Sequence, residues 1–373
     1  MSVESAPDPS RPVAATPLAR LIARRIADSG PITVREYMTL CLSHPEHGYY
    51  RARRAIGAAG DFITAPEISQ VFGELLGLWA AVVWQQMGSP APFQLVELGP
   101  GCGTMMADAL RATQRVKGFS NAARVVLVEA SPVLRDMQRQ TLAQTTVDVR
   151  WLAEAAEIKP APTILLANEF LDVLPITQLM REGDGWHEIT VELDVRGTLT
   201  FGSKAACWRE ALPSLAHAAP IGSVLELRDF APLSETLAAI AAGSPLGALF
   251  IDYGHEATGF GDTLQAVRQH RSEPPLAAPG EADLTAMVDF EAAAAALTNG
   301  RVMVERLATQ AEFLGSLGAI ERGSRLMSAN PARAGEIEMG VARLMSPQGM
   351  GTRFKALGLR SSDMPTLPGF PQH

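Results

Sequence analysis

Hydrophobic residues in the first quarter of the chain follow the spacing of amphipathic helices. Between Leu18 and Ile26 they recur three and four positions apart, which places them on one helix face. A longer run over residues 66–88 is also helical in pattern and opens with a proline, which is favoured in the first turn of a helix. We therefore predict a helical N-terminal portion over residues 18–92, preceded by a disordered, proline-rich tail over residues 1–17.

The spacing changes from residue 93 onward, where short, fully apolar runs alternate with helical stretches over residues 104–115 and 132–143. Apolar runs of this length separated by helices indicate parallel strands that are buried on both faces. The pattern therefore predicts an α/β core with a doubly wound sheet over residues 93–373. Residues 176–230 instead alternate between apolar and polar positions, so we expect antiparallel strands inserted into this core.

The composition argues against several classes of function. A net charge of −8 without a basic stripe argues against nucleic-acid binding. Three widely spaced cysteines form neither a disulfide framework nor a metal-binding pair, which favours a reducing compartment. The most apolar run, over residues 75–84, is shorter than the roughly 20 residues that span a bilayer. We also expect no metal, because the two histidines of residues 44–47 stand alone.

A glycine-rich turn follows the first apolar run of the predicted core, in the stretch VELGPGCGTMMADALR over residues 96–111. A phosphate-binding P-loop requires a lysine after its glycines, and none follows them here. The spacing of the glycines also departs from the dinucleotide fingerprint G-x-G-x-x-G. The pattern Glu97-x-Gly99-x-Gly101-x-Gly103 fits an S-adenosylmethionine site instead.

This cofactor would give each residue of the turn a role. Its methionine end must lie almost on the backbone, which residues without Cβ permit, and its carboxylate gains from amide donors at a helix N-terminus. Glu97 can attract the ammonium group. Glu129, which ends the next apolar run, can accept from both ribose hydroxyls, and Glu154 is a weaker candidate for the adenine amine. The predicted cofactor-binding residues are Glu97, Gly99, Pro100, Gly101, Gly103, Thr104 and Glu129. Alternatively, the glycines only form a tight turn and the acids pair with solvent or a lysine.

A second group of polar residues, Asn168, Glu169 and Asp172, follows another apolar run. The carboxyl ends of neighbouring strands share one crevice in a doubly wound sheet, so we expect these catalytic candidates to face the cofactor's methyl group. Acids there would select a cationic acceptor such as a guanidinium, which planar carboxylates bind bidentately. Alternatively, Asn168 caps a short helix that has Glu169 in its first turn and ends at Pro175.

Three candidates for contacting the substrate or covering the site lie at the end of a third apolar run: Asp252, Tyr253 and His255. His255 is either a general base or, as a single histidine beside a loop, a hydrogen-bonded support. The segment over residues 255–285 is rich in Gly, Pro, Asp and His. It is too long for a simple connection, so we expect it to be functional or mobile.

Six long motifs together resemble one family. They are GDFITAPEISQVFGELLG, ELGPGCGTMMADALR, VEASPVLRDMQ, ANEFLDVLPI, LFIDYGHEATGFGDTLQAVRQHR and PGEADLTAMVDF, and the resemblance runs from about Leu18 to Arg360. The chain resembles the MidA-type S-adenosylmethionine-dependent methyltransferases. Mitochondrial members of that family are assembly factors for respiratory complex I and methylate an arginine of its quinone-module subunit.

The resemblance implies a Rossmann-like class I methyltransferase fold with S-adenosyl-L-methionine as cofactor, contacted at the glycine turn and Glu129. It implies a guanidinium held by the acidic stretch that contains Glu169. By this resemblance, the residues that cover the cofactor or admit the substrate would be Gly60, Asp61, Phe62, Thr64 and Glu67. Met287 stands where relatives often carry histidine, which weakens any role for that side chain.

The function expected from this resemblance is arginine methylation of a complex I subunit during assembly. Because the chain lacks a transit-like start, we expect a bacterial, cytoplasmic member of the family. Two alternatives remain open. One is an assembly chaperone that binds the cofactor without transferring its methyl group. The other is a small-molecule methyltransferase, which an enclosed apolar pocket over Asp252 and Tyr253 would favour.

Overall fold

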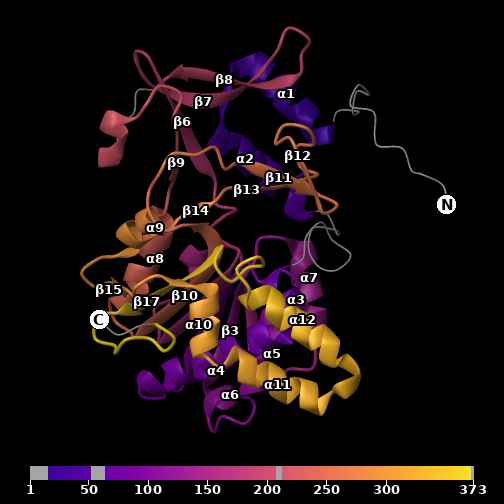
Figure 1. The fold of residues 1–373 in the computed structure, drawn as a ribbon, viewed down its shortest axis with the longest axis vertical. Helices are drawn as coiled ribbons and strands as arrows, with labels where there is room; N and C mark the ends of the chain where they lie inside the picture. The colour runs from indigo at the N-terminus through magenta and orange to yellow at the C-terminus, as the bar shows by residue number, and fades with distance from the viewer. Residues whose placement is uncertain (1–15, 52–63, 207–211, 371–373) are drawn as a thin grey trace, which may run out of the picture.

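The computed structural model describes residues 16–51, 64–206 and 212–370. Figure 1 shows a large sheet flanked by helices at one end of the molecule and an antiparallel sheet with α1 and α2 at the other. The two parts meet where the carboxyl ends of the parallel strands point, which is where ligands bind in open α/β sheets.

The large sheet has the strand order β15-β17-β10-β5-β2-β3-β4. Its parallel strands are β2 (Phe93–Leu98), β3 (Ala123–Val128), β4 (Asp148–Leu152), β5 (Thr163–Asn168) and β10 (Leu246–His255). β17 (Phe354–Ser361) runs antiparallel to both β10 and β15 (Val302–Val304). The chain winds outward from β2 to β4 on one side and from β5 to β10 on the other. The predicted doubly wound core is therefore confirmed, and its switch point lies between β2 and β5.

Helices bury both faces of this sheet, as the fully apolar strands predict. Leu95 and Val96 of β2 belong to different hydrophobic clusters, because successive side chains of a strand point to opposite faces. One face packs against α4 (Gln70–Gln86), α5 (Thr104–Thr113), α10 (Gln310–Ser316), α11 (Ala319–Ala329) and α12 (Ala334–Met345). The other packs against α8 (Ala231–Ala241) and α9 (Phe290–Leu297).

The inserted segment forms the predicted antiparallel strands. They are β6 (Ile176–Glu182), β7 (Gly185–Leu193), β8 (Leu199–Ala205) and β9 (Val224–Arg228), and β1 (Ile32–Thr33) joins them at the edge of β7. A separate hydrophobic cluster unites this sheet with α1 (Pro17–Ser29) and α2 (Val34–Ser43). The same cluster includes residues of β11 (Gln265–Arg268) and β13 (Asp283–Thr285), which pair in a three-stranded sheet with β12 (Arg271–Glu273).

Two features differ from the prediction. The helix expected over residues 66–88 is divided at Ser69, whose extended backbone (φ −155°) separates α3 (Ala65–Ile68) from α4 and whose side chain accepts from the backbone N–H of Val71. The N-terminal portion is also shared between two hydrophobic clusters, because α1 and α2 pack on the inserted sheet whereas α4 packs on the large sheet. The position of a domain boundary near residue 92 stays a prediction.

The remaining elements are short. They are α6 (Phe119–Ala122), α7 (Pro132–Thr141), β14 (Val288–Asp289), β16 (Ala308–Thr309) and 3-10 turns at Tyr49–Arg51, Ala155–Glu157, Ser214–Ala218 and Pro331–Arg333. No helix within the described ranges is long and apolar enough to cross a membrane.

Candidate functional site

A cavity of about 380 Å³ lies beyond the carboxyl ends of β2, β3 and β5, at the switch point of the large sheet. Its volume is within the range of small-molecule sites. Six of the seven predicted cofactor-binding residues line it, together with Asn168, Glu169, Thr64 and Glu67. The seventh, Gly103, is the N-cap of α5 behind the lining, where a Cβ would lie 3.4 Å from Gln138.

The glycine turn needs its glycines for conformational reasons. Gly99, Gly101 and Gly103 all have positive φ angles, of 62°, 53° and 82°. A side chain at such φ values is disfavoured by about 1–2 kcal/mol. At Gly99 an added Cβ would also lie 3.2 Å from the ring of Phe170, which is tighter than an ordinary van der Waals contact. The turn therefore presents bare backbone to the cavity, as the predicted methionine end requires.

Glu97 brings a buried carboxyl group into this cavity, and the described residues that line the cavity include no lysine or arginine. Its side chain is 2% exposed, and its Oε2 has no hydrogen-bond partner among the described residues. Burial raises the pKa of Glu97 to about 8. A buried carboxylate is costly unless it is paired, so the site fits a ligand that brings a positive group to Oε2. The ammonium of S-adenosylmethionine meets this requirement.

Glu129, at the end of β3, is held by the protein at both carboxylate oxygens. Oε1 accepts from the backbone N–H of Ser131 at 2.7 Å, and Oε2 accepts from Nε2 of Gln138 at 3.3 Å. Burial raises its pKa, whereas these hydrogen bonds lower it. Each carboxylate oxygen has a second lone pair, so both remain able to accept from a ribose hydroxyl.

The acidic stretch after β5 is a strained loop. Glu169 has a φ of 50°, an uncommon value for a residue with a side chain that is often found at functional sites. Its Oε1 accepts from Nδ2 of Asn168 at 3.0 Å and from the backbone N–H of Ala65 at 3.3 Å. Burial, with a smaller contribution from Asp172, raises the pKa of Glu169 to about 7. No helix follows Asn168, so the alternative of a simple helix cap is wrong.

Asp172 belongs to the same loop but is not among the residues that line the cavity. It is 3% exposed, and its Oδ1 has no hydrogen-bond partner within the described part of the chain. Burial raises the pKa of Asp172 to about 6, although the nearby Arg228 opposes the change. The structure therefore separates the three catalytic candidates: Asn168 and Glu169 line the cavity, whereas Asp172 does not and acts on Glu169 by raising its pKa.

Asp252 and Arg228 both bind the backbone of the acidic loop. Oδ2 of Asp252, on β10, accepts from the backbone N–H groups of Leu171 at 2.8 Å and Asp172 at 3.1 Å. Arg228, at the end of β9, donates to the carbonyl oxygens of Leu174, Asp172, Ala286 and Met287 at 3.0, 3.4, 3.0 and 3.2 Å. One arginine of the inserted sheet thus joins the acidic loop to the segment before β14.

None of Asp252, Tyr253 and His255, the candidates at the end of β10, is among the described residues that line this cavity, so a substrate or lid role for them stays a prediction. Asp252 is fully buried beneath the acidic loop, and the hydroxyl of Tyr253 donates to Thr285 Oγ1 at 2.6 Å. His255 lines a different cavity, of about 340 Å³, and its Nδ1 contacts the carbonyl of Ala257 at 2.8 Å. The end of β10 runs past the cofactor cavity toward β14, to which it is paired at residues 254–255.

The residues expected to cover the cofactor are described only in part. Gly60, Asp61 and Phe62 lie outside the described residues. Thr64 and Glu67 line the cavity, and Oε1 of Glu67 accepts from the hydroxyl of Thr104 at 2.6 Å, which joins the N-terminal portion to the glycine turn.

Sequence reasoning missed several residues of the site, among them Gln138, Tyr50 and Phe170. Gln138 on α7 contacts both the glycine turn and Glu129, and Tyr50 and Phe170 line the cavity. For Gln138 a signal existed: it is polar but falls on the buried side of an amphipathic helix with Leu134. Nothing in the spacing places Tyr50 there, because it reaches the site from a different part of the fold.

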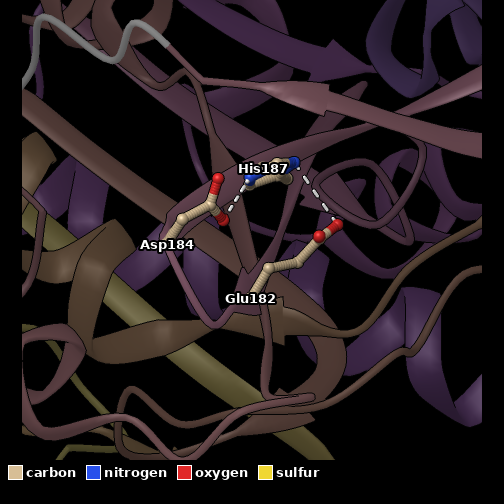
Figure 2. Close-up of side chains that lie close together, drawn as sticks. All are labelled: Glu182, Asp184 and His187. Atoms are coloured by element: carbon tan, nitrogen blue, oxygen red, sulfur yellow. Dashed lines mark hydrogen bonds and ion pairs between the residues drawn. The ribbon is translucent and has the colours of Figure 1, made fainter.

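A cluster of possible metal ligands lies away from this cavity, at the hairpin between β6 and β7. Figure 2 shows His187 between two carboxylates: Nδ1 is 3.3 Å from Glu182 Oε1 and Nε2 is 2.9 Å from Asp184 Oδ1. Both ring nitrogens therefore already have anionic partners. His187 therefore links the two carboxyl groups of this hairpin.

The arrangement can bind a cation-bearing nucleoside and a second, cationic group next to it. Glu97, Glu129 and Glu169 all line the one cavity, and no lysine or arginine is among its described lining residues. Because carboxyl groups in a shared, poorly solvated space favour positive partners, the cavity suits a sulfonium cofactor and a guanidinium acceptor.

Comparison with known proteins agrees with this chemistry. Residues 75–305 match the family model described as S-adenosyl-L-methionine-dependent methyltransferase. The chain is 36% identical to the mitochondrial protein arginine methyltransferase NDUFAF7 of Rattus norvegicus, over 92% of this chain and 84% of that protein. It is also 36% identical to the human protein of the same name, over 92% and 83%.

A solved structure shows the same fold with a ligand. A protein from Burkholderia thailandensis bound to S-adenosyl-homocysteine superposes with a TM-score of 0.83 at 26% sequence identity, over 94% of this chain and 93% of that one. A second crystal structure from the same organism superposes with a TM-score of 0.79 at 26% identity, over 95% and 94%. The predicted Rossmann-like methyltransferase fold is thereby confirmed.

Proposed function

This chain belongs to the MidA-type family of S-adenosyl-L-methionine-dependent methyltransferases, and we propose that it methylates an arginine of a protein, a quinone-module subunit of respiratory complex I, during assembly. Its cofactor is S-adenosyl-L-methionine. The relatives named protein arginine methyltransferase support an arginine as the methyl acceptor. For this chain the proposal rests on one observation: the strained, partly buried Glu169 lines the cofactor cavity.

The cofactor supplies an electrophilic methyl group on a sulfonium. Within this chain, Glu97 would hold the ammonium, the N-terminus of α5 would favour the carboxylate, and Glu129 would bind the ribose hydroxyls. The buried and unpartnered Oε2 of Glu97 supports this arrangement. These contacts fix the reacting carbon in one place, which is the main contribution a protein makes to an in-line displacement.

Glu169 would bind the guanidinium of the acceptor and accept a proton from it. A carboxylate at this position would pair with the attacking nitrogen and with one of its neighbours in the guanidinium. When the nitrogen–carbon bond replaces the sulfur–carbon bond, S-adenosylhomocysteine would leave, and the Glu169 carboxylate would accept the proton that the methylated nitrogen loses. A pKa near 7 suits this transfer at neutral pH. Asn168 keeps Oε1 of Glu169 in place by donating to it.

An enclosed apolar pocket over Asp252 and Tyr253 would favour the small-molecule alternative. Neither residue is among the described residues that line the cofactor cavity, so this observation does not support it. The alternative of a chaperone without transfer activity is separated from the proposal by the Glu169→Gln variant: a chaperone would still support complex I assembly, whereas the proposed enzyme would lose the methyl mark. The cytoplasmic location remains a prediction.

The deciding experiment compares complex I subunits from cells with and without this gene by mass spectrometry. We expect one arginine of a quinone-module subunit to carry methyl groups only in cells that have the gene. Complementation with Glu169→Gln should restore protein level but not the mark. An unchanged methylation pattern in the deletion cells would overturn the proposed acceptor.

A further inference from the structure

One buried amide bridges the two halves of the cofactor site. Gln138 on α7 is fully buried, and its Nε2 donates to the carbonyl oxygen of Gly101 at 2.8 Å and to Oε2 of Glu129 at 3.3 Å. Its Oε1 accepts from Nε1 of Trp151, on β4, at 2.8 Å. A single side chain therefore connects the glycine turn after β2 with the end of β3 and with β4.

Trp151 fixes which way this amide points. An indole N–H can only donate, so the amide atom that faces it must be the carbonyl oxygen. The two N–H groups of Gln138 are then directed at Gly101 and Glu129, both of which can only accept at those atoms. The guanidinium of Arg139 lies 5.0 Å from the centroid of the Trp151 ring, which helps to keep the indole in place.

We propose that Gln138 is a positioning residue for S-adenosylmethionine: it holds the glycine turn and the Glu129 carboxylate at a fixed separation, so that the methionine and ribose portions are bound together. The glycine turn also lies next to this residue at Gly103, where an added Cβ would be 3.4 Å from Cγ of Gln138. Groups set in place before binding lose less conformational freedom when the ligand arrives, which raises affinity.

A purely structural amide would behave differently. If Gln138 only satisfied buried polar groups, its replacement would lower the stability of the fold and the fraction of active protein, but each folded molecule would bind the cofactor as before. Affinity per folded site, together with its dependence on Glu129, separates the two roles.

The test measures binding of S-adenosylhomocysteine to the full chain by calorimetry, which requires no methyl acceptor and is independent of the proposed function. Gln138→Leu should weaken binding about 10- to 150-fold at unchanged stoichiometry, the scale of a lost hydrogen bond to a charged group. Gln140→Ala is the matched control, because Gln140 is exposed on the same helix. It should bind like the wild type.

A double-mutant cycle tests whether Gln138 acts through Glu129. The double variant Gln138→Leu/Glu129→Gln should bind within about threefold of the weaker single variant, because both changes disrupt the same hydrogen-bonded pair of Gln138 and Glu129. Trp151→Phe, which retains an aromatic ring but frees the amide, should weaken binding by a smaller factor and carries the test should Gln138→Leu fail to fold. Wild-type affinity in these variants, or effects that multiply in the double variant, would overturn the proposal.

Discussion

The buried carboxyl group of Glu97 makes cofactor binding a proton-linked event. With its pKa raised to about 8, roughly nine in ten unliganded molecules carry Glu97 protonated at pH 7. An ammonium group at Oε2 favours the ionised form, so binding lowers this pKa and expels the proton. We expect about 0.9 proton to be released per cofactor bound at pH 7, and affinity to rise about tenfold from pH 6 to pH 7.

Glu97→Gln preserves the shape of the side chain and removes its negative charge. Loss of one partner of a buried charge pair costs about 2–4 kcal/mol, which corresponds to about a 30- to 1000-fold loss of affinity for S-adenosylmethionine. The proton release should disappear with it. Calorimetric titrations in two buffers of different protonation enthalpy measure the affinity and the number of protons together.

A truncated ligand provides the matched control. 5′-Methylthioadenosine lacks the amino-acid end, so it should bind the wild type and Glu97→Gln equally and release no proton from this group. If S-adenosylmethionine instead binds Glu97→Gln within about threefold of the wild type, or releases as many protons from both, its ammonium does not lie against Glu97 and the reasoning is refuted.

Three further predictions concern the turn, the acceptor and the loop. Gly99→Ala, which places a Cβ at φ 62° against Phe170, should lower stability by about 1–2 kcal/mol in denaturant titrations; an unchanged midpoint would contradict this. In the wild type, kcat/KM for the acceptor should fall as pH drops through about 7, because protonated Glu169 neither pairs with a guanidinium nor accepts a proton. Glu169→Gln should reduce kcat/KM about 100-fold and remove this pH dependence. The affinity of the variant for the cofactor should be unchanged. Arg228→Gln should speed hydrogen exchange at the backbone amides of Leu171 and Asp172, because the acidic loop loses its bonds to Arg228. Arg35→Gln, which loses a hydrogen bond to Thr177 on the same inserted sheet, should not. Equal exchange in both variants would show that Arg228 does not hold the loop.

Local features of the site could be predicted from the sequence because they depend on nearby residues. A strand, a turn of glycines and a helix follow one another within residues 93–113, so Glu97 and the turn are placed together by covalent connection. Glu129 and Asn168 end parallel strands next to β2, and such strand ends meet at one edge of a sheet. The acidic stretch was identified in the same way.

The same reasoning does not place the residues at the end of β10, because the length of that strand determines where they lie. Asp252 also ends a run next to β5, but β10 continues to His255 and pairs with β14 there, so its last residues lie beyond the cofactor cavity. Asp252 then points beneath the acidic loop and binds its backbone. An apolar run does not indicate how far its strand extends.

The sequence by itself determined the layered α/β core, the antiparallel insertion, the bare-backbone turn and the acids at two strand ends, because periodicity and chain order control them. Only the tertiary structure decided their chemistry. Burial raises the pKa of Glu97 and leaves its Oε2 without a partner, Gln138 meets Gly101 from 37 residues away, and Arg228 reaches Asp172 from 56 residues away. Desolvation and such contacts depend on how distant segments pack, which no local pattern contains.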